Sequence, residues 1–283
     1  MFKAKKSLGQ NWLKSESAIR EIIKAADLKE GEEVLEIGPG KGVLTKALIE
    51  TGAKVLAIEK DNDLIAFLQE KFTDEIKTGK LILIHDDVLK LNFSKTLLTH
   101  ETKSRGKNTL GNKTKYKLVA NIPYYITGQV IRKFLSEEDR QPSQMVLMVQ
   151  KEVAKRITVN PSTSLRVTDK ESLLSLSVKA YGEPKYIKTV PAGAFDPKPN
   201  VDSAILLIAN ISRNFFGEAC PERSRREEKF FEILKKGFSQ KRKLLKSNLG
   251  VGEEVLVACN IPAKARAENL TLENWYCLTR SAQ

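Results

Sequence analysis

Short apolar runs alternate with segments of helical periodicity along most of this chain. The runs are too short for helices and predict buried strands at 34–37, 54–58, 81–84, 118–120 and 145–150. Apolar residues spaced three and four apart predict helices between them, among which Ser15 or Ser17 caps the first. Strands alternating with helices are typical of an α/β fold. We therefore predict a Rossmann-like, mostly parallel, doubly wound sheet.

The second half of the chain divides differently. We predict further strands at 172–180 and 186–190, and a last strand ends before residue 211. Two polar stretches interrupt the pattern and predict a loop insertion at 94–117 and a flexible linker at 217–228. Helical spacing returns with Phe230, Phe231, Leu234 and Phe238. These changes predict one large domain over 1–211 and a small helical domain over 212–283.

The charge of the chain indicates what class of partner it binds. The chain of 283 residues has a formal net charge of +13, and two of its segments, 1–14 and 235–246, carry clusters of basic residues without any acid. Such clusters indicate a polyanionic partner, most simply nucleic acid, although basic proteins also carry merely solvated lysines. We interpret 235–246 as a basic RNA-binding helix.

The apolar runs, cysteines and histidines of the chain indicate its cellular compartment and restrict its possible chemistry. No apolar run approaches the ~18 residues of a membrane span, and the lysine-rich start lacks the apolar core of a signal peptide. Cys220, Cys259 and Cys277 are odd in number, far apart and without a C-x-x-C pair. We therefore expect a reduced, cytoplasmic protein without a metal site. Only two histidines are present, which leaves little scope for histidine catalysis.

The most informative stretch is VLEIGPGKGVLT, residues 34–45, where a strand, a glycine-rich turn and a helix follow one another. A dinucleotide-binding G-x-G-x-x-G would need its third glycine at Val43, which disfavours a nicotinamide oxidoreductase. The spacing E-x-G-x-G-x-G from Glu36 resembles the S-adenosylmethionine motif of class I methyltransferases. A glycine-rich turn without a ligand is the alternative.

Carboxylates follow the next two predicted strands. Glu59 closes the second strand, where an acid is placed to accept both ribose hydroxyls of a bound nucleoside. A solvated acid at a strand end is the alternative. Asp86 and Asp87 follow the third strand, and Asp87 is the position that matches the class I aspartate bonded to the adenine amino group of the cofactor.

Asn121-Ile122-Pro123-Tyr124 ends the fourth predicted strand and has a specific chemistry. The lone pair of an adenine N6 is delocalised into the ring, so this amine is a poor nucleophile. The amide oxygen of Asn121 and the carbonyl of Ile122 or Pro123 can accept its N–H bonds and stabilise the charge that develops on it. Tyr124 offers a face for a flipped base. Phe195, on a proline-rich loop, either packs inward or stacks on the other side of that base.

Together these motifs resemble the small-subunit (16S) rRNA adenine N6,N6-dimethyltransferase family over nearly the whole chain. The matching segments are GQNWL, VLEIGPGKGVLT, NIPYYIT, QKEVAKRI, VPAGAFDPKPNVDSA and KRKLLKSNL. Trp12 in place of the usual Phe, His85 and the two interruptions depart from the family pattern.

The resemblance implies dimethylation of two adjacent adenosines near the 3′ end of small-subunit rRNA, with S-adenosylmethionine as cofactor and the pre-30S particle as partner of a monomeric enzyme. By position it implies a set of cofactor contacts, namely Asn11, Leu13, Gly38, Glu59, Asp87 and Asn121. It places Asn121, Tyr124 and Phe195 at the target adenine. Two alternatives stay open: a large-subunit rRNA methyltransferase of the macrolide-resistance type, and a non-catalytic assembly or transcription factor on the same fold.

Overall fold

A computed structural model describes residues 4–5, 8–93, 115–159, 170–217 and 221–281. It divides into two compact units, one of residues 1–154 and 185–211 and the other of 155–184 and 212–283. One boundary between the two units falls between residues 211 and 212. The second unit also takes in 155–184, which the sequence analysis assigned to the first domain.

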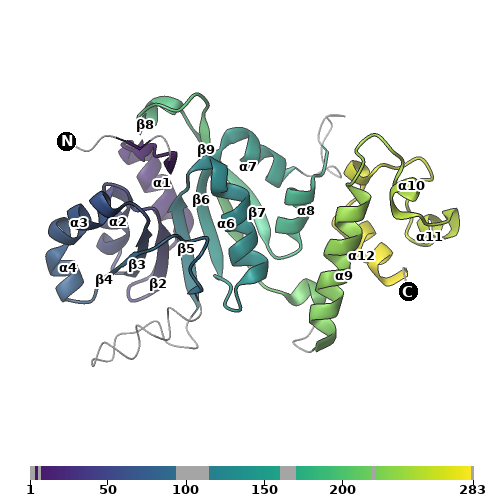
Figure 1. Ribbon diagram of the computed structural model, residues 1–283, viewed down its shortest axis with the longest axis horizontal. Helices are drawn as coiled ribbons and strands as arrows, with labels where there is room; N and C mark the ends of the chain where they lie inside the picture. The colour runs from purple at the N-terminus through teal and green to yellow at the C-terminus, as the bar shows by residue number, and fades with distance from the viewer. Residues whose placement is uncertain (1–3, 6–7, 94–114, 160–169, 218–220, 282–283) are drawn as a thin grey trace. The chain divides into compact units, whose positions relative to one another are not determined.

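A seven-stranded sheet in the order β4-β3-β2-β5-β6-β9-β7 forms the centre of the first unit (Figure 1). Adjacent strands from β4 to β6 are parallel, whereas β9 runs antiparallel to β6. The strands are β2 (Glu33–Ile37), β3 (Lys54–Glu59), β4 (Leu81–His85), β5 (Tyr116–Asn121), β6 (Gln144–Gln150), β7 (Glu183–Val190) and β9 (Ser203–Ala209). This arrangement confirms the predicted mostly parallel, Rossmann-like sheet. It also brings the carboxyl ends of β2, β3, β4 and β5 to one edge.

Helices pack on both faces of this sheet because most residues of its central strands, on both faces, are buried. On one face, buried residues of α1 (Glu16–Ala26), α2 (Val43–Glu50) and α3 (Asn62–Lys71) form a common core with the strands. On the other face, Phe134 and Phe93 pack edge to face, and Phe93 contacts Tyr116 of β5. In the described part of the first unit, further helical segments are α4 (Thr73–Lys77), the 3₁₀ turn η2 (Tyr124–Ile126), α6 (Thr127–Arg132), the π-helix η3 (Lys133–Glu137) and the 3₁₀ turn η4 (Ala192–Ala194).

Ser15 confirms one of the two predicted caps. Its Oγ accepts a hydrogen bond from the amide of Ala18 at 3.3 Å, which satisfies a free donor at the start of α1. Just before this cap, β1 (Trp12–Leu13) pairs antiparallel with β8 (Phe195–Asp196). The N-terminal segment is therefore held beside the proline-rich loop.

The second unit is helical, and the chain enters it through α7 (Lys151–Thr158). Its further helical segments are α8 (Leu173–Lys179), η5 (Asn214–Phe216), α9 (Pro221–Gly237), α10 (Leu245–Leu249), α11 (Glu253–Ala258), η6 (Ala267–Asn269) and α12 (Leu272–Ser281). Phe216, Phe230 and Trp275 are fully buried among these helices. The predicted small helical C-terminal domain is confirmed as a fold.

Two of the secondary-structure predictions are wrong, and in both cases the residues that start a helix explain the difference. The segment 172–180 is helix α8 and not a strand, because Ser172 and Ser175 form a reciprocal capping box that starts a helix despite the alternating pattern. Residues 221–228 are the first turns of α9 and not a linker, and a proline stands at the first helical position.

The predicted basic helix over 235–246 is also wrong. Helix α9 ends at Gly237 and α10 begins at Leu245, so the basic residues span a helix end, a connection and a second helix. Asn248 stabilises the break, because its Nδ2 donates to the carbonyls of Gly237 and Gln240 at 2.6 and 3.0 Å.

Three other predictions concern the cysteines, the insertion at 94–117 and membrane crossing. Cys259 and Cys277 form a disulfide with a Cα–Cα distance of 5.6 Å, which contradicts the expectation that all cysteines are reduced. Of the predicted insertion at 94–117, residues 94–114 lie outside the described part of the chain, whereas 116 and 117 begin β5. None of the helices in the described part combines the length and apolar character that a membrane crossing requires.

Candidate active site

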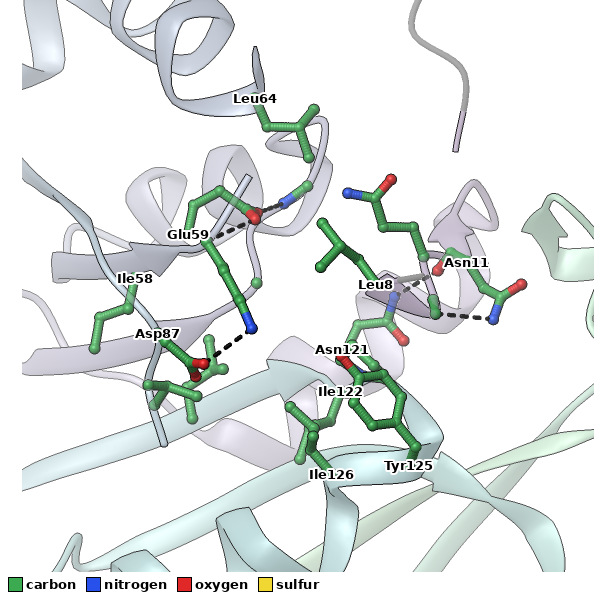
Figure 2. Close-up of a pocket in the computed structure, with 18 of the residues that line it drawn as sticks. Leu8, Asn11, Ile58, Glu59, Leu64, Asp87, Asn121, Ile122, Tyr125 and Ile126 are labelled. Atoms are coloured by element: carbon green, nitrogen blue, oxygen red, sulfur yellow. Dashed lines mark hydrogen bonds and ion pairs between the residues drawn. The ribbon is translucent and has the colours of Figure 1, made fainter. Parts of the chain in front are cut away.

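One cleft of the first unit opens at the carboxyl ends of the parallel strands. It encloses about 910 Å³, counting its open mouth, and is lined by the ends of β2, β3 and β5, by the loop after β4 and by residues 8–12. The carboxyl edge of a doubly wound sheet is where proteins of this architecture bind their ligands. Figure 2 shows Glu59 and Asp87 on one side of the cleft and Asn121, Ile122 and Tyr125 on the other.

Glu59 is the most firmly held side chain of the cleft. It ends β3, is only 6% exposed, and accepts backbone N–H bonds from Gly40 at 3.2 Å and from Lys60 and Asp61 at 2.9 Å each. Burial raises the pKa of the Glu59 carboxyl, and these three bonds oppose that shift. The result is a fixed acceptor at the rim of the cleft, suited to a pair of ligand hydroxyls.

The glycine turn leaves the space that a ligand needs. Gly38 has a φ of +67°, and a Cβ added there would meet no protein atom within 4 Å, although Gly38 lines the cleft. At Gly40, with a φ of +57°, a Cβ would lie 2.8 Å from Cδ1 of Trp12. Glycine at position 38 keeps the cleft open to a ligand. Glycine at position 40 leaves room for the Trp12 ring that covers the turn.

Asp87 lines the same cleft and is also fixed. Its Oδ2 accepts from Lys60 Nζ at 2.9 Å, the ion pair drawn in Figure 2, and its Oδ1 accepts from the amide of Leu89 at 3.0 Å. Partial burial favours a higher pKa for Asp87, but the bonds from Lys60 and Leu89 and the charges of Lys60 and Lys90 together outweigh it, so the pKa is lowered. Asp86 is exposed, and its Oδ1 accepts from the amide of Asp87 at 2.6 Å.

The side-chain amide of Asn121 has a definite orientation. Its nitrogen lies 3.0 Å from the backbone carbonyl oxygen of Asn11. Because a carbonyl oxygen can only accept, the NH₂ end of the amide must face Asn11. The amide oxygen of Asn121 is thereby left as an acceptor at the end of β5.

Tyr124 follows two residues after Ile122 and lines the same cleft. Its hydroxyl lies 2.7 Å from Oγ of the fully buried Ser203 of β9. Burial raises the pKa of the Tyr124 phenol, so it stays neutral. A half-buried ring anchored at its hydroxyl can present a face to a base without moving.

The structure brings together six of the residues predicted for the site, Asn11, Gly38, Glu59, Asp87, Asn121 and Tyr124, all of which line the cleft. Leu13 and Phe195 do not line it. They oppose each other in the β1–β8 pair and are 6% and 2% exposed, packed into the core. The structure therefore places Phe195 inward, the first of the two arrangements that its sequence allowed.

Sequence reasoning missed the contacts that hold the N-terminal segment over the cleft. Asp61, the N-cap of α3, accepts from Lys5 Nζ at 2.5 Å and from Gln10 Nε2 at 2.8 Å. Lys41 Nζ lies 4.0 Å from the ring centre of Trp12, a cation–π contact. Gln10 stands within GQNWL, and this motif was the only signal for these contacts, because pairs about 50 residues apart leave no spacing pattern.

Strand order, glycine turn and buried acids together define a class I S-adenosylmethionine-dependent methyltransferase. The model of the family described as ribosomal RNA adenine dimethylase matches residues 1–283, and this chain belongs to that family. A Dehalococcoides mccartyi protein described as ribosomal RNA small subunit methyltransferase A is 39% identical over 284 residues, covering 98% of this chain and 87% of the relative. A protein of the same description from Alkaliphilus oremlandii is 35% identical over 290 residues, covering 99% and 92%.

Solved structures agree with this fold. A dimethyladenosine transferase from Plasmodium falciparum superposes with a TM-score of 0.71 at 25% identity, covering 94% of this chain and 95% of the other. The 23S rRNA methyltransferase ErmE superposes with a TM-score of 0.70 at 20% identity, covering 96% and 99%, a likeness of fold alone.

Two acids of the cleft are expected to determine cofactor affinity. Glu59→Gln and Asp87→Asn should each weaken S-adenosylmethionine binding by about 1–3 kcal/mol, because each substitution removes a charged acceptor from a bound donor. Asp86→Asn is the matched control and should leave affinity unchanged. Isothermal titration calorimetry measures all three; equal losses for Asp86→Asn and Asp87→Asn would contradict the assignment of Asp87.

A second buried acid lies behind the glycine turn. Glu36 in β2 is 1% exposed, and its Oε2 forms no hydrogen bond with any residue that the structure describes. Burial, with the nearby Glu59 carboxyl adding to it, raises the pKa of Glu36 from 4.5 to about 8. Between these values the folded chain binds a proton that the unfolded chain releases, so stability falls as the pH rises through this window.

Glu36→Gln should remove this pH dependence because glutamine does not titrate. From pH 5 to 8 the free energy of unfolding of the variant should rise relative to that of the wild type by about 1 kcal/mol for each pH unit. Urea denaturation at several pH values measures the difference. Parallel curves for the two proteins would show that Glu36 titrates normally.

Proposed function

We propose that this chain transfers methyl groups from S-adenosylmethionine to N6 of two adjacent adenosines near the 3′ end of small-subunit rRNA. The observation that supports it best is the orientation of Asn121, whose amide oxygen is free to accept while its nitrogen is held by Asn11. The small-subunit relatives named above, which cover nearly the whole chain, support the choice of rRNA. The pre-30S particle in the cytoplasm is then the partner of a monomeric enzyme.

The cleft holds the cofactor and the target base at opposite sides in this proposal. Glu59 accepts the ribose hydroxyls, Asp87 accepts the adenine amino group, and Gly38 gives the nucleoside room beside the main chain. When bound, S-adenosylmethionine supplies an electrophilic methyl group. Asn11 acts through its backbone carbonyl, which orients Asn121.

The target amine needs a second acceptor beside Asn121, and one of the two candidate backbone carbonyls can be chosen. The carbonyl of Pro123 already accepts the amide of Ile126 at 3.1 Å, within the 3₁₀ turn η2. The carbonyl of Ile122 has no hydrogen bond to any residue that the structure describes. We assign the two N–H bonds of N6 to Asn121 Oδ1 and Ile122 O. They stabilise the positive charge as the nitrogen becomes tetrahedral, and no general base is required.

Asn121 and Tyr124 should have different roles in the reaction, which substitutions can distinguish. Asn121→Ala should lower the rate of methyl transfer by about 10²–10³, since it removes an acceptor that strengthens as charge develops. Tyr124→Phe keeps the ring and should be mild, whereas Tyr124→Ala should lose ~1–3 kcal/mol of base stacking. Single-turnover kinetics with labelled cofactor on unmethylated small subunits separates the three variants.

The same assay tests the function itself. Mass spectrometry of the rRNA should find dimethyladenosine in small subunits and none in large subunits treated in parallel. Methylation of large subunits alone would favour the macrolide-resistance alternative, and methylation of neither would favour a non-catalytic factor. If Tyr124→Phe lowered the rate of methyl transfer as much as Tyr124→Ala, the hydroxyl and not the ring face would act on the base.

RNA binding should depend on exposed cations of the second unit. Lys241, Arg242 and Lys243 are all exposed, between α9 and α10. Neutralising them together should weaken binding to small-subunit rRNA and reduce the slope of log affinity against log salt by about 2. The matched control neutralises the exposed Lys24, Lys77 and Lys80 of the first unit. Equal slopes for both triple variants would assign these three cations to a solvated surface.

A further inference from the structure

Tyr125 is an exposed aromatic residue at the edge of the candidate active site. It is 61% exposed, which is unusual for a large ring, and it lines the cleft next to Asn121 and Ile122 (Figure 2). Its hydroxyl forms no hydrogen bond with any residue that the structure describes. Neither folding nor the chemistry assigned above uses this ring surface.

Tyr124 and Tyr125 face different directions although they are neighbours. Both belong to the 3₁₀ turn η2, in which three residues make one turn, so successive side chains point about 120° apart. The Tyr124 ring turns inward and its hydroxyl meets Ser203 of β9. The two rings therefore present surfaces in different directions, and that of Tyr125 is exposed at the cleft.

The place of the Tyr125 ring is fixed by the N-terminal segment. A Cβ added at Gly9 would lie 2.9 and 3.1 Å from Cε1 and Cδ1 of Tyr125. Those two carbons form one side of the ring, and the absence of a side chain at Gly9, which has a φ of +59°, lets them pack there. The rest of the ring surface stays open to solvent at the mouth of the cleft.

RNA entering this cleft needs such a surface. An adenine that reaches Asn121 has left its stack, which costs free energy and exposes the neighbouring base. Resting on the proposed function, we propose that Tyr125 stacks on the base adjacent to the target adenosine. It compensates for the stacking that the RNA loses and holds the backbone that leads into the cleft. Tyr125 is thus a substrate-positioning residue outside the acceptor pair.

Three substitutions at this exposed position test the proposal. With unmethylated small subunits as substrate, Tyr125→Ala should raise KM by about 5- to 150-fold, Tyr125→Phe should match the wild type, and Tyr125→Leu should lie between. The Kd of S-adenosylmethionine should stay constant, which also shows that each variant is folded. Loss of cofactor affinity with unchanged KM would overturn the proposal and make Tyr125 a cover of the cofactor. Equal damage in Tyr125→Phe and Tyr125→Ala would overturn it too.

Changing the RNA completes the test. Small subunits reconstituted from transcribed rRNA carry uridine in place of the base that precedes, or the base that follows, the pair of target adenosines. Uridine stacks weakly, so on one side it should raise the KM of the wild type but leave that of Tyr125→Ala unchanged. Additive effects on both sides would overturn the proposal. A wild type that fails to methylate any small subunit would instead refute the proposed function.

Discussion

The site depends on one buried carboxylate whose position is set by backbone amides. Glu59 joins three parts of the chain, since it accepts an amide of the glycine turn and two amides that lead from β3 into α3. A buried acid without those donors would be costly, so the turn and the start of α3 are held in the one arrangement that satisfies it. Asp61, next in this line, binds Lys5 and Gln10 and so holds the N-terminal segment. That segment supplies the carbonyl of Asn11 that orients Asn121.

The sequence was sufficient to predict the polar cleft residues that lie at or just after strand ends. Glu59, Asp87 and Asn121 each follow a short apolar run, and parallel strands bring their carboxyl ends to one edge. Asn121 was predicted with its chemical role, but not with its orientation. That orientation depends on Asn11, which is 110 residues away in the sequence. The same holds for Lys60, whose pairing with Asp87 no spacing rule indicates.

Where prediction failed, a contact distant in sequence or a local cap had decided the structure. Phe195 stands in a proline-rich loop that resembles an exposed connection, yet its pairing with Leu13 places it in the core. Ser172 and Ser175 turned an alternating pattern into a helix. The pairing of Cys259 with Cys277 depends on how α11 and α12 meet, and spacing alone gave no sign of it.

The orientation of Asn121 has a consequence for how many times one adenosine reacts. In the proposed reaction, an unmodified N6 offers two hydrogens to two acceptors, Asn121 Oδ1 and Ile122 O. The first methyl group leaves one hydrogen and therefore one bond, and the second leaves none. The pocket thus loses its hold on the base step by step as the product forms. Two fixed oxygens, one of them aimed by the carbonyl of Asn11, are enough to make the doubly methylated base the form that is released.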